Sequence, residues 1–383
     1  MLSHHTITTW RALAPARKAW ASLRDDVAHP FQRLDWLSAW QAHIGADQGV
    51  TPLIVSVGPR PEAPWMLLPL ATWRRGGLRV LGWLGGDISD YPGPIISRRC
   101  PPALRGAGFR ALWDRILSAS PPADVVVLGR QLADLGGGAN PLLTLPHTRH
   151  QADAHVAHLG PDWGRYYASR CSGRTRRRHR QKWNRMARAG AVSMAVLSDA
   201  AQRQEALQGF LDLKSAGYQA LGVRDLFAEE GYRRFVRALC ALPSGPLHFS
   251  TLRVGGSLWA GNLGLTHRGR LYLLFPAYRR TPAAAACSPG AALTRWLLQQ
   301  GCESGLEAVD FTLGDEPFKA RWCDTRLPVF QVTQPLTTRG RVMAGGLQAW
   351  GAIKRQLKQH PVLYPAVLRA RARHSTTLGR LKR

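Results

Sequence analysis

The sequence predicts an α/β fold in two halves, followed by a basic helical tail. Helix-like segments with apolar residues three or four positions apart alternate with short apolar segments typical of buried strands. The chain has 383 residues, a length that suggests two domains, and 45% of them are hydrophobic, enough for a core in each. A Gly/Pro-rich segment, residues 136–146, separates the two series of elements. We therefore expect domains at residues 1–146 and 147–334, and a tail at residues 335–383.

The first half is expected to begin with a long helical segment and to continue as strands. Apolar residues recur at intervals of three or four within residues 10–45, which indicates a buried helical stripe. The expected strands are residues 52–57, 65–72, 78–84 and 124–128, with a loop at 85–94 and a helix at 103–118. This order is that of one α/β unit.

The second half alternates more regularly. Its expected strands are residues 155–159, 191–197, 247–254, 257–266, 270–278 and 306–313. Its expected helices are residues 162–169, 174–188, 200–217, 229–242 and 291–300. Gly255-Gly256 lies between two strands and predicts a two-residue hairpin turn.

Composition excludes several classes of protein. No run of about 18 apolar residues occurs, and the first ten residues are too polar for the apolar core of a signal peptide. Six scattered cysteines favour reduced thiols in the cytoplasm over a disulfide framework. Four histidines between residues 147 and 158 lack the spacing of a zinc motif, so we expect no metal.

The formal net charge of +28 is concentrated in two places. Residues 174–188 contain eight Lys or Arg without an acidic residue, and the chain from Thr325 onward contains twelve, again without one. Such concentration favours contacts with phosphates or another polyanion for the first run, and with an anionic membrane surface for the amphipathic tail. The alternatives are a solvated helix face for the run and a helix packed on the core for the tail.

Residues 288–322 carry the arrangement most indicative of chemistry. Ser288-Pro289-Gly290 precedes a helix, and the free N–H groups at a helix N-terminus attract anions. The next strand contains Asp310 and is followed by the segment Gly314-Asp315-Glu316-Pro317-Phe318-Lys319. A phosphate-binding helix start beside a strand that ends in ionisable groups is typical of an active site. A simple helix cap and a solvated charged turn are the alternatives.

These residues resemble the acyl-CoA N-acyltransferase superfamily (GNAT), and within it the CelD-like branch with the BioF2-like acetyltransferase domain, related to the peptidoglycan Fem transferases. The branch usually reads Ser-Pro-Gly, a helix, Asp-Phe-x-x-Gly-x-Glu-x-Tyr-Lys and then Trp. The matching residues are Ser288, Pro289, Gly290, Asp310, Phe311, Gly314, Asp315, Glu316, Phe318, Lys319 and Trp322. Phe318 stands where the branch usually has Tyr. A looser resemblance from about Trp36 to about Val332 implies two GNAT-like mixed-sheet halves, the first of them degenerate.

The resemblance also implies a donor and a set of site residues. The donor would be acyl-CoA, such as acetyl-CoA, with its pyrophosphate at Ser288, Pro289 and Gly290. The catalytic candidates are Asp310, Glu316, Tyr278 and Lys319: either acid could take the acceptor's proton, Tyr278 could protonate the leaving thiolate, and Lys319 could pair with an acid. The substrate-binding candidates are Asp90, Tyr91, Asp315, Arg177 and Arg180. Asp310 paired with an arginine and Tyr278 as a core or rim aromatic are the structural alternatives.

Three functions follow from these observations. The first is a cytoplasmic enzyme, peripheral at the inner face of the membrane, that acylates an amine or hydroxyl of a small-molecule, sugar, cell-envelope or exopolysaccharide precursor. The second is a Fem-like transferase whose donor is aminoacyl-tRNA, with tRNA bound by the basic helix. The third is a non-catalytic protein on a degenerate GNAT fold that binds RNA or another polyanion.

Overall fold

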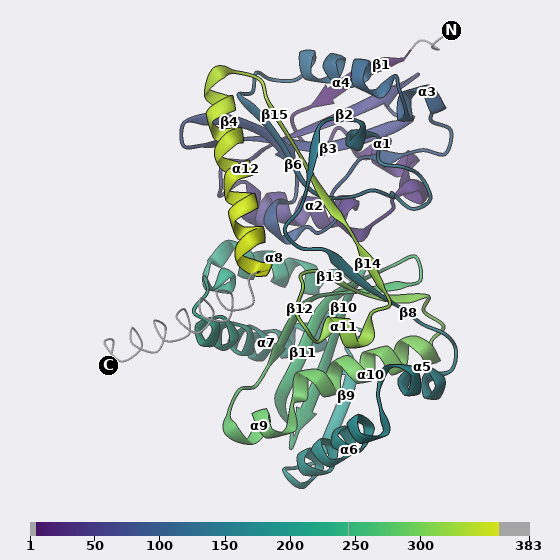
Figure 1. The fold of residues 1–383 in the computed structure, drawn as a ribbon, viewed down its shortest axis with the longest axis vertical. Coiled ribbons are helices and arrows are strands. Elements are labelled where there is room, and N and C mark those ends of the chain that lie inside the picture. Colours follow the sequence, from purple (N-terminus) through teal and green to yellow (C-terminus); the bar gives the residue numbers. More distant parts are fainter. Residues whose placement is uncertain (1–4, 244, 360–383) are drawn as a thin grey trace. The chain divides into compact units, whose positions relative to one another are not determined.

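The computed structural model describes residues 5–243 and 245–359, which form two compact units (Figure 1). The first unit contains the chain up to Asp153 and the later segment Leu327–Gln356, whereas the second contains Ala154–Arg326. This division differs from the expected boundaries at residues 146 and 334. The reason is that β15 (Val329–Pro335), assigned from sequence to the second half, pairs with a strand of the first unit.

The first unit is built on a mixed sheet of eight strands. Their order is β1-β2-β3-β4-β6-β15-β7, and β5 pairs with β3. Neighbouring strands are antiparallel except for β4 and β6, which are parallel. The bounds are Thr6–Trp10 (β1), Thr51–Gly58 (β2), Met66–Arg75 (β3), Leu78–Trp83 (β4), Ile95–Ile96 (β5), Val125–Leu132 (β6) and His147–Arg149 (β7). The expected strands of the first half are therefore confirmed, while β1, β5 and β7 were not predicted.

The prediction of one helical segment over residues 10–45 is wrong. This part of the chain contains α1 (Arg17–Ser22), two 3₁₀ turns (Arg24–Asp26 and Pro30–Gln32) and α2 (Leu34–Trp40), which continues as a π-helix (Gln41–Gly45). Pro30 lacks an N–H and holds the preceding His29 in an extended conformation, so a continuous helix cannot form there. Most of the apolar stripe is nevertheless buried, with Phe31 and Leu37 each 1% exposed.

The core of the first unit lies between the sheet and α4 (Phe109–Ser118), which follows the short α3 (Pro102–Arg105). Residues Phe109, Leu112, Trp113 and Ile116 lie three or four positions apart and are all buried. This spacing gives α4 one apolar face, and that face covers the strands. Two further 3₁₀ turns are Gly86–Ile88 and Pro141–Thr144.

The described part of the tail is α12 (Thr338–Gln359), and its beginning packs on the first unit. Ala344 is 4% exposed and lies against Val80 and Val125. A Cβ atom on Gly340 would lie 1.8 Å from the backbone oxygen of Asp124, so only glycine fits at that contact. Of the two alternatives for the tail, packing on the core therefore applies to these first turns. Residues 360–383 of the expected basic tail lie outside the described residues.

The second unit has a seven-stranded sheet with the order β14-β8-β13-β12-β11-β10-β9. The bounds are Ala154–His158 (β8), Val192–Val196 (β9), Leu247–Val254 (β10), Ser257–His267 (β11), Arg270–Tyr278 (β12), Ala308–Leu313 (β13) and Thr325–Leu327 (β14). Gly255 and Gly256 join β10 to β11 with positive φ angles of 54° and 77°, which confirms the predicted two-residue turn.

Helices cover both faces of this sheet (Figure 1). α7 (Ala200–Leu221) and α8 (Glu230–Ala241) lie on one face, where Phe210 contacts Phe249 at 5.4 Å between ring centroids. α5 (Trp163–Arg170), α6 (Gly173–Arg188) and α10 (Pro289–Glu303) cover the other. The remaining helices are Leu226–Ala228 (a 3₁₀ turn), α9 (Pro282–Cys287) and α11 (Lys319–Trp322). The Ala-rich segment at 283–286 lies in α9, because Pro282 starts a helix well and four alanines continue it.

The strands β12 and β13 run parallel for only three residue pairs, from Arg270↔Ala308 to Tyr272↔Asp310, and then separate. Two irregularities accompany the separation. Leu273 and Phe275 pair with consecutive residues of β11, so Leu274 is an extra residue in β12, a β-bulge. In β13, Thr312 has a φ angle of 56°. The sheet is therefore split between two central strands. Across the described residues, no helix is long and apolar enough to cross a membrane.

Candidate active site

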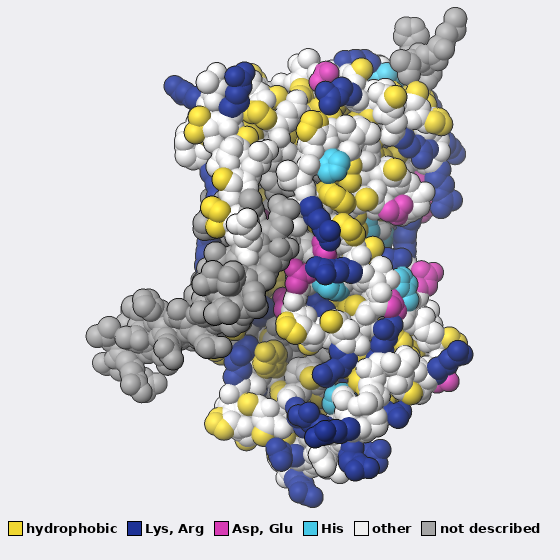
Figure 2. Space-filling view, viewed as in Figure 1, with side chains coloured by type: hydrophobic (Ala, Val, Ile, Leu, Met, Phe, Trp, Pro, Cys, Tyr) yellow, Lys and Arg dark blue, Asp and Glu magenta, His cyan; other side chains and the backbone are white. Residues whose placement is uncertain are grey.

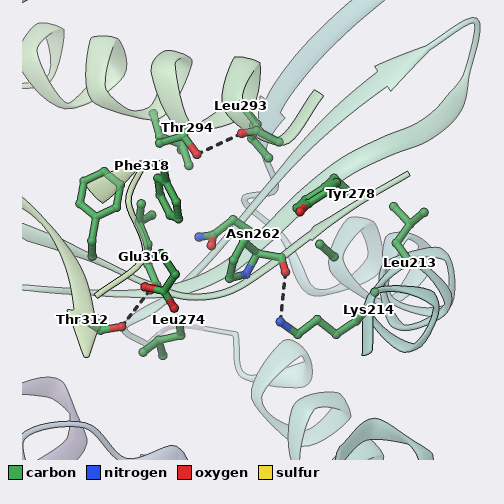
Figure 3. A pocket seen from close by; sticks show the side chains of 18 of the residues that line it. Leu213, Lys214, Asn262, Leu274, Tyr278, Leu293, Thr294, Thr312, Glu316 and Phe318 are labelled. Atoms are coloured by element: carbon green, nitrogen blue, oxygen red, sulfur yellow. Dashed lines mark hydrogen bonds between the residues drawn. The ribbon is translucent and has the colours of Figure 1, made fainter. Parts of the chain in front are cut away.

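A cavity of about 360 Å³ lies where β12 and β13 separate (Figure 3). Its wall is made by α7, β11, β12, α10, β13 and the turn after β13, all from the second unit. Apolar side chains such as Leu213, Leu274 and Leu293 form most of the lining, and a few polar groups lie among them. An apolar cavity with a few polar side chains is the usual form of a small-molecule site.

Asn262 is one of these polar groups and was not predicted from sequence. It is 3% exposed and lies in the middle of β11. Its amide nitrogen Nδ2 is buried and has no hydrogen-bond partner among the described residues. An unpaired buried donor is costly, about 1–3 kcal/mol, so such groups are rare unless a ligand or water satisfies them. Asn262 is therefore a candidate donor to a bound substrate.

Lys214 is the second polar residue that sequence reasoning missed. It continues the apolar stripe of α7 that includes Leu207 and Phe210, and a lysine at a stripe position was the signal that could have revealed it. Its Nζ donates to the backbone oxygen of Pro276 at 3.1 Å and lies 4.9 Å from the ring centre of Tyr218. Burial, and to a smaller extent the nearby Arg280, lowers the pKa of Lys214 to about 8. A large fraction of this amine is neutral near pH 8.

Tyr278 lies at the end of β12 and lines the cavity. It is 38% exposed, so it is a rim residue, and Arg280 donates to its hydroxyl oxygen at 3.0 Å. The guanidinium of Arg280 also lies over the ring, 4.6 Å from its centre. A cation in these positions stabilises negative charge on the hydroxyl oxygen, as an acid catalyst requires after it gives up its proton.

Glu316 and Lys319 form an ion pair at the other end of the cavity. Glu316 is half exposed, whereas Lys319 is 4% exposed. The Nζ of Lys319 donates to Glu316 Oε2 at 2.9 Å and to the backbone oxygens of Thr312 and Leu313 at 3.3 and 3.1 Å. Lys319 therefore joins the end of β13 to the following turn and holds the Glu316 carboxylate at the cavity.

Asp310 and Asp315 lie close to this pair in sequence but are not among the residues that line the cavity. Asp310 is 1% exposed, and its Oδ1 accepts the N–H of Thr312 at 2.7 Å. Asp315 lies 3.2 Å from Nε2 of His155 and 3.5 Å from the guanidinium of Arg326. Both carboxylates thus have protein partners in the structure, and their proposed roles in catalysis and substrate binding remain predictions.

The N-terminus of α10 lies beside the cavity, where Gly290 contacts the ring of Tyr278. Ser288 does not cap this helix as predicted, because it links α9 to α10 in a left-handed conformation and its side chain makes no capping hydrogen bond. Instead, Lys182 of α6 donates to the Ser288 hydroxyl at 2.7 Å, and Arg185 donates to the backbone oxygen of Ala286 at 3.4 Å. The positive end of the helix dipole and two cations therefore meet at this junction, which favours an anion such as a pyrophosphate.

The other predicted substrate-binding residues lie away from this cavity. Asp90 and Tyr91 belong to the first unit, where Asp90 pairs with Arg130 at 3.5 Å and Tyr91 is buried. Arg177 and Arg180 lie on α6 and line a separate groove. No group of three or more His, Cys, Asp or Glu that could hold a metal ion occurs within residues 5–243 and 245–359.

Comparisons with known proteins agree with this geometry. The family model for the acetyltransferase (GNAT) domain matches residues 173–320. No curated protein matches the sequence.

Three solved structures share the fold at low sequence identity. FemX is 12% identical, with a TM-score of 0.54 over 84% of this chain and 96% of its own. The C-terminal domain (DUF2156) of a putative lysylphosphatidylglycerol synthetase from Agrobacterium fabrum is 13% identical, with a TM-score of 0.52 over 88% and 95%. A conserved protein of unknown function from Bacteroides thetaiotaomicron is 12% identical, with a TM-score of 0.50 over 85% and 99%. At such identity the likeness concerns the fold alone.

The split sheet, the cavity in the split and the helix that begins beside it form a candidate ligand site between two diverging central strands. The match over residues 173–320 assigns the acetyltransferase (GNAT) domain to the second unit. The GNAT domain predicted from residues 288–322 is thereby confirmed in the second unit.

Proposed function

We propose that the second unit transfers an acyl group from acyl-CoA to an amine or hydroxyl of a sugar or cell-envelope precursor. The observation that carries the proposal is the cavity in the split between β12 and β13, with a cationic helix start at one end. The diphosphate of the donor would lie against the N–H groups of α10 with Lys182 and Arg185 beside it. The thioester would lie in the apolar cavity. We also propose that this domain belongs to the CelD-like branch, which has the BioF2-like acetyltransferase domain.

The reaction requires one bond to form and one to break. The acceptor nitrogen or oxygen bonds to the thioester carbon and loses a proton, and the C–S bond breaks as the thiolate leaves. Glu316 and Lys214 are the two groups in the cavity able to take the acceptor's proton. Tyr278 is the group able to protonate the thiolate, and Arg280 stabilises the resulting charge on its oxygen.

Negative charge on the thioester oxygen also needs stabilisation. The bulge at Leu274 places a residue of β12 opposite no partner in β11, and Leu274 lines the cavity. We assign the backbone N–H at this bulge to the thioester oxygen, because oriented amide donors stabilise such charge without reorganisation. Asn262 would donate to a carbonyl of the donor chain, which gives its buried amide a partner.

We also propose that the basic C-terminal segment associates with an anionic membrane surface on its cytoplasmic side. The alternative with aminoacyl-tRNA as donor would need the adenosine end of the RNA in the same cavity. CoA binding separates the two donors directly, since a tRNA-dependent enzyme has no need of CoA.

Calorimetric titration of the full chain with CoA and acetyl-CoA tests the donor site. Lys182→Ala should weaken binding about tenfold or more, because it removes a charged partner of the phosphates. Arg178→Ala is the matched control, because it removes one exposed cation from the same helix without touching the junction with α10. Gly290→Glu is a poorer probe, since a Cβ there would lie 2.8 Å from the Tyr278 ring.

Release of the free thiol from acetyl-CoA, followed over a panel of amino sugars and envelope precursors, tests the activity. Absence of CoA binding to the wild-type chain would refute the donor. Equal loss of affinity in Lys182→Ala and Arg178→Ala would refute the phosphate position.

A further inference from the structure

A second hollow, of about 720 Å³, lies on the second unit among α5, α6, α10 and β9. Four large aromatic side chains line it, all of them half-buried: Trp163, Tyr167, Trp183 and Trp296. Trp163 and Tyr167 stack with their rings 4.8 Å apart and 10° from parallel. Tyr167 also stacks on His179 at 6.0 Å and 12°. We call this hollow the aromatic groove; its wall presents flat ring faces that are only partly covered.

The aromatic groove is separate from the cavity of the candidate active site. Both use α10, but the cavity takes Gly290, Leu293, Thr294 and Leu297, whereas the groove takes Arg295, Trp296 and Gln299. At 100° per residue these two sets point to opposite sides of the helix. A ligand of the groove is therefore not the thioester bound in the cavity.

Cations surround the aromatic groove. Arg176, Arg177, Arg180 and Arg295 line it, and Lys and Arg side chains gather over α6 in Figure 2. In the described part of the chain, no carboxylate forms an ion pair with any of these four. Their charge is thus available to an external anion, and it is not neutralised within the fold.

His179 also lines the aromatic groove, and the positive charges around the groove affect it. Its Nδ1 lies 2.7 Å from the hydroxyl of Tyr167. Burial and the nearby cations Arg295, Arg321, Lys182 and Arg178 together lower the pKa of His179 to about 4, with burial the largest cause. The imidazole is neutral at pH 7, so it contributes a ring face and a hydrogen bond, while the cations that line the groove are all arginines.

The chemistry of the lining selects the type of ligand. The groove lining holds no carboxylate and a single amide, Gln299, so it offers few acceptors for the hydroxyl groups of a neutral sugar. Arginines pair with phosphates, and aromatic rings stack on nucleobases whatever their sequence. Four arginines beside four aromatic side chains match a phosphate joined to a planar base.

We propose that the aromatic groove binds nucleotides, with a base stacked on the rings of Trp163 and Trp183 and with phosphates paired to Arg177 and Arg180. The nucleotide is either free or part of a single-stranded RNA, since both present the same base and phosphate. This site goes beyond the proposed acyl transfer. Whether the groove binds nucleotides does not depend on whether the cavity binds CoA.

The test uses the full chain and a fluorescein-labelled single-stranded RNA of six adenosines, with binding followed by fluorescence anisotropy at several salt concentrations. Arg177→Gln/Arg180→Gln should weaken binding about tenfold or more. It should also lower the slope of log affinity against log salt by about 1.4, since each phosphate contact on a single strand contributes about 0.7. Arg174→Gln/Arg178→Gln removes the same charge from exposed positions of α6 that do not line the aromatic groove and should change affinity by less than about threefold.

Calorimetry with ADP distinguishes the two sources. Binding of ADP with the same dependence on Arg177 and Arg180 assigns the groove to free nucleotides. Binding of RNA without measurable ADP binding assigns it to a strand. Equal weakening by the two double variants would show diffuse attraction and overturn the proposal. Displacement of the RNA by inorganic polyphosphate of matched charge at the same concentration would overturn it as well, because base stacking would then contribute nothing.

Discussion

Lys214 gives the sharpest test of how the cavity is built. Its amine lies near the rings of Tyr218 and Phe275 and is partly removed from water. It donates one hydrogen bond, to the backbone oxygen of Pro276. Burial and the neighbouring Arg280 lower its pKa from 10.5 to about 8. Lys214→Met keeps the length and most of the packing of the side chain but cannot titrate. The difference in stability between the wild type and this variant therefore isolates one ionisation.

The sign of the effect follows from proton binding. Between pH 8 and 10.5 the unfolded chain holds the Lys214 proton more tightly than the folded chain, so the free energy of unfolding rises with pH in this window. The full effect of a shift from 10.5 to about 8 is about 3 kcal/mol. Between pH 7 and pH 9.5 the wild type should gain about 2 kcal/mol relative to Lys214→Met. Below pH 7 the difference should be constant.

Urea denaturation of both full-length proteins at intervals of half a pH unit measures this difference. Other groups titrate in both proteins and cancel in the subtraction. A difference that stays flat up to pH 9.5 would show that Lys214 has an ordinary pKa and is well hydrated, which would refute the description of the cavity as apolar. If Lys214 also takes the acceptor's proton, the wild-type rate of acyl transfer should rise toward pH 8, and Lys214→Met should lose that rise.

Four other substitutions have distinct expected outcomes. Glu316→Gln should lower the rate of thiol release on the order of 100-fold while CoA affinity, measured by calorimetry, stays nearly unchanged. Lys319→Met should destabilise the second unit by about 3 kcal/mol in urea, because two backbone oxygens lose a buried charged donor; a loss below about 1 kcal/mol would contradict this. Asn262→Leu should leave stability equal or higher, since it removes an unpaired buried donor, but should raise the KM for acetyl-CoA. Gly340→Ala should destabilise the first unit by more than 2 kcal/mol, about the cost of a severe core clash, because its Cβ would overlap the backbone oxygen of Asp124; an unchanged unfolding curve would disprove the packing of α12.

Local patterns predicted most of the sheet strands because each is a short apolar segment bounded by turn residues. The hairpin of β10 and β11 is the clearest case, since Gly255-Gly256 fixes both its position and its turn. β15 was not predicted as a strand, and nearly all of its residues were assigned to the wrong domain. Its partners, β6 and β7, lie about 200 residues earlier, and pairing over that distance leaves no local signal. The same applies to β1, whose residues show no alternation.

The candidate site was predictable only where a motif runs along the chain. Residues 288–290 and 310–319 lie at the split of the sheet, as their order suggested, because a strand, a helix start and the next strand are consecutive there. Lys214 and Asn262 come from a helix and a strand outside that segment. Only the folded chain brings these two residues to the cavity. From residue type alone, Lys214 could equally be a surface lysine, and Asn262 an amide at the end of a strand.

The irregular backbone at the split has its own cause in the sequence. Asp310 is the last residue of β13 that pairs with β12, and its carboxylate binds the N–H of Thr312, a residue at positive φ. This side-chain bond gives the chain an alternative to continuing the ladder, as Asp commonly does at turns. Asp310 thus helps β13 to leave β12 at the place where the cavity begins, a structural contribution that is present whether or not it also takes part in proton transfer.

The basic residues of α6 lie on two sides of the helix. At 100° per residue, Lys182 and Arg185 point away from Arg177 and Arg180. The first pair reaches the start of α10, and the second pair lines the aromatic groove. Net charge alone predicted an anionic ligand for this helix but could not show that its cations divide between two sites. Because the pairs share no partner, their effects should be additive: substitutions of Lys182 should weaken CoA and spare RNA, and substitutions of Arg177 and Arg180 should do the reverse. A single anionic ligand spread over the whole helix would instead lose affinity with either pair.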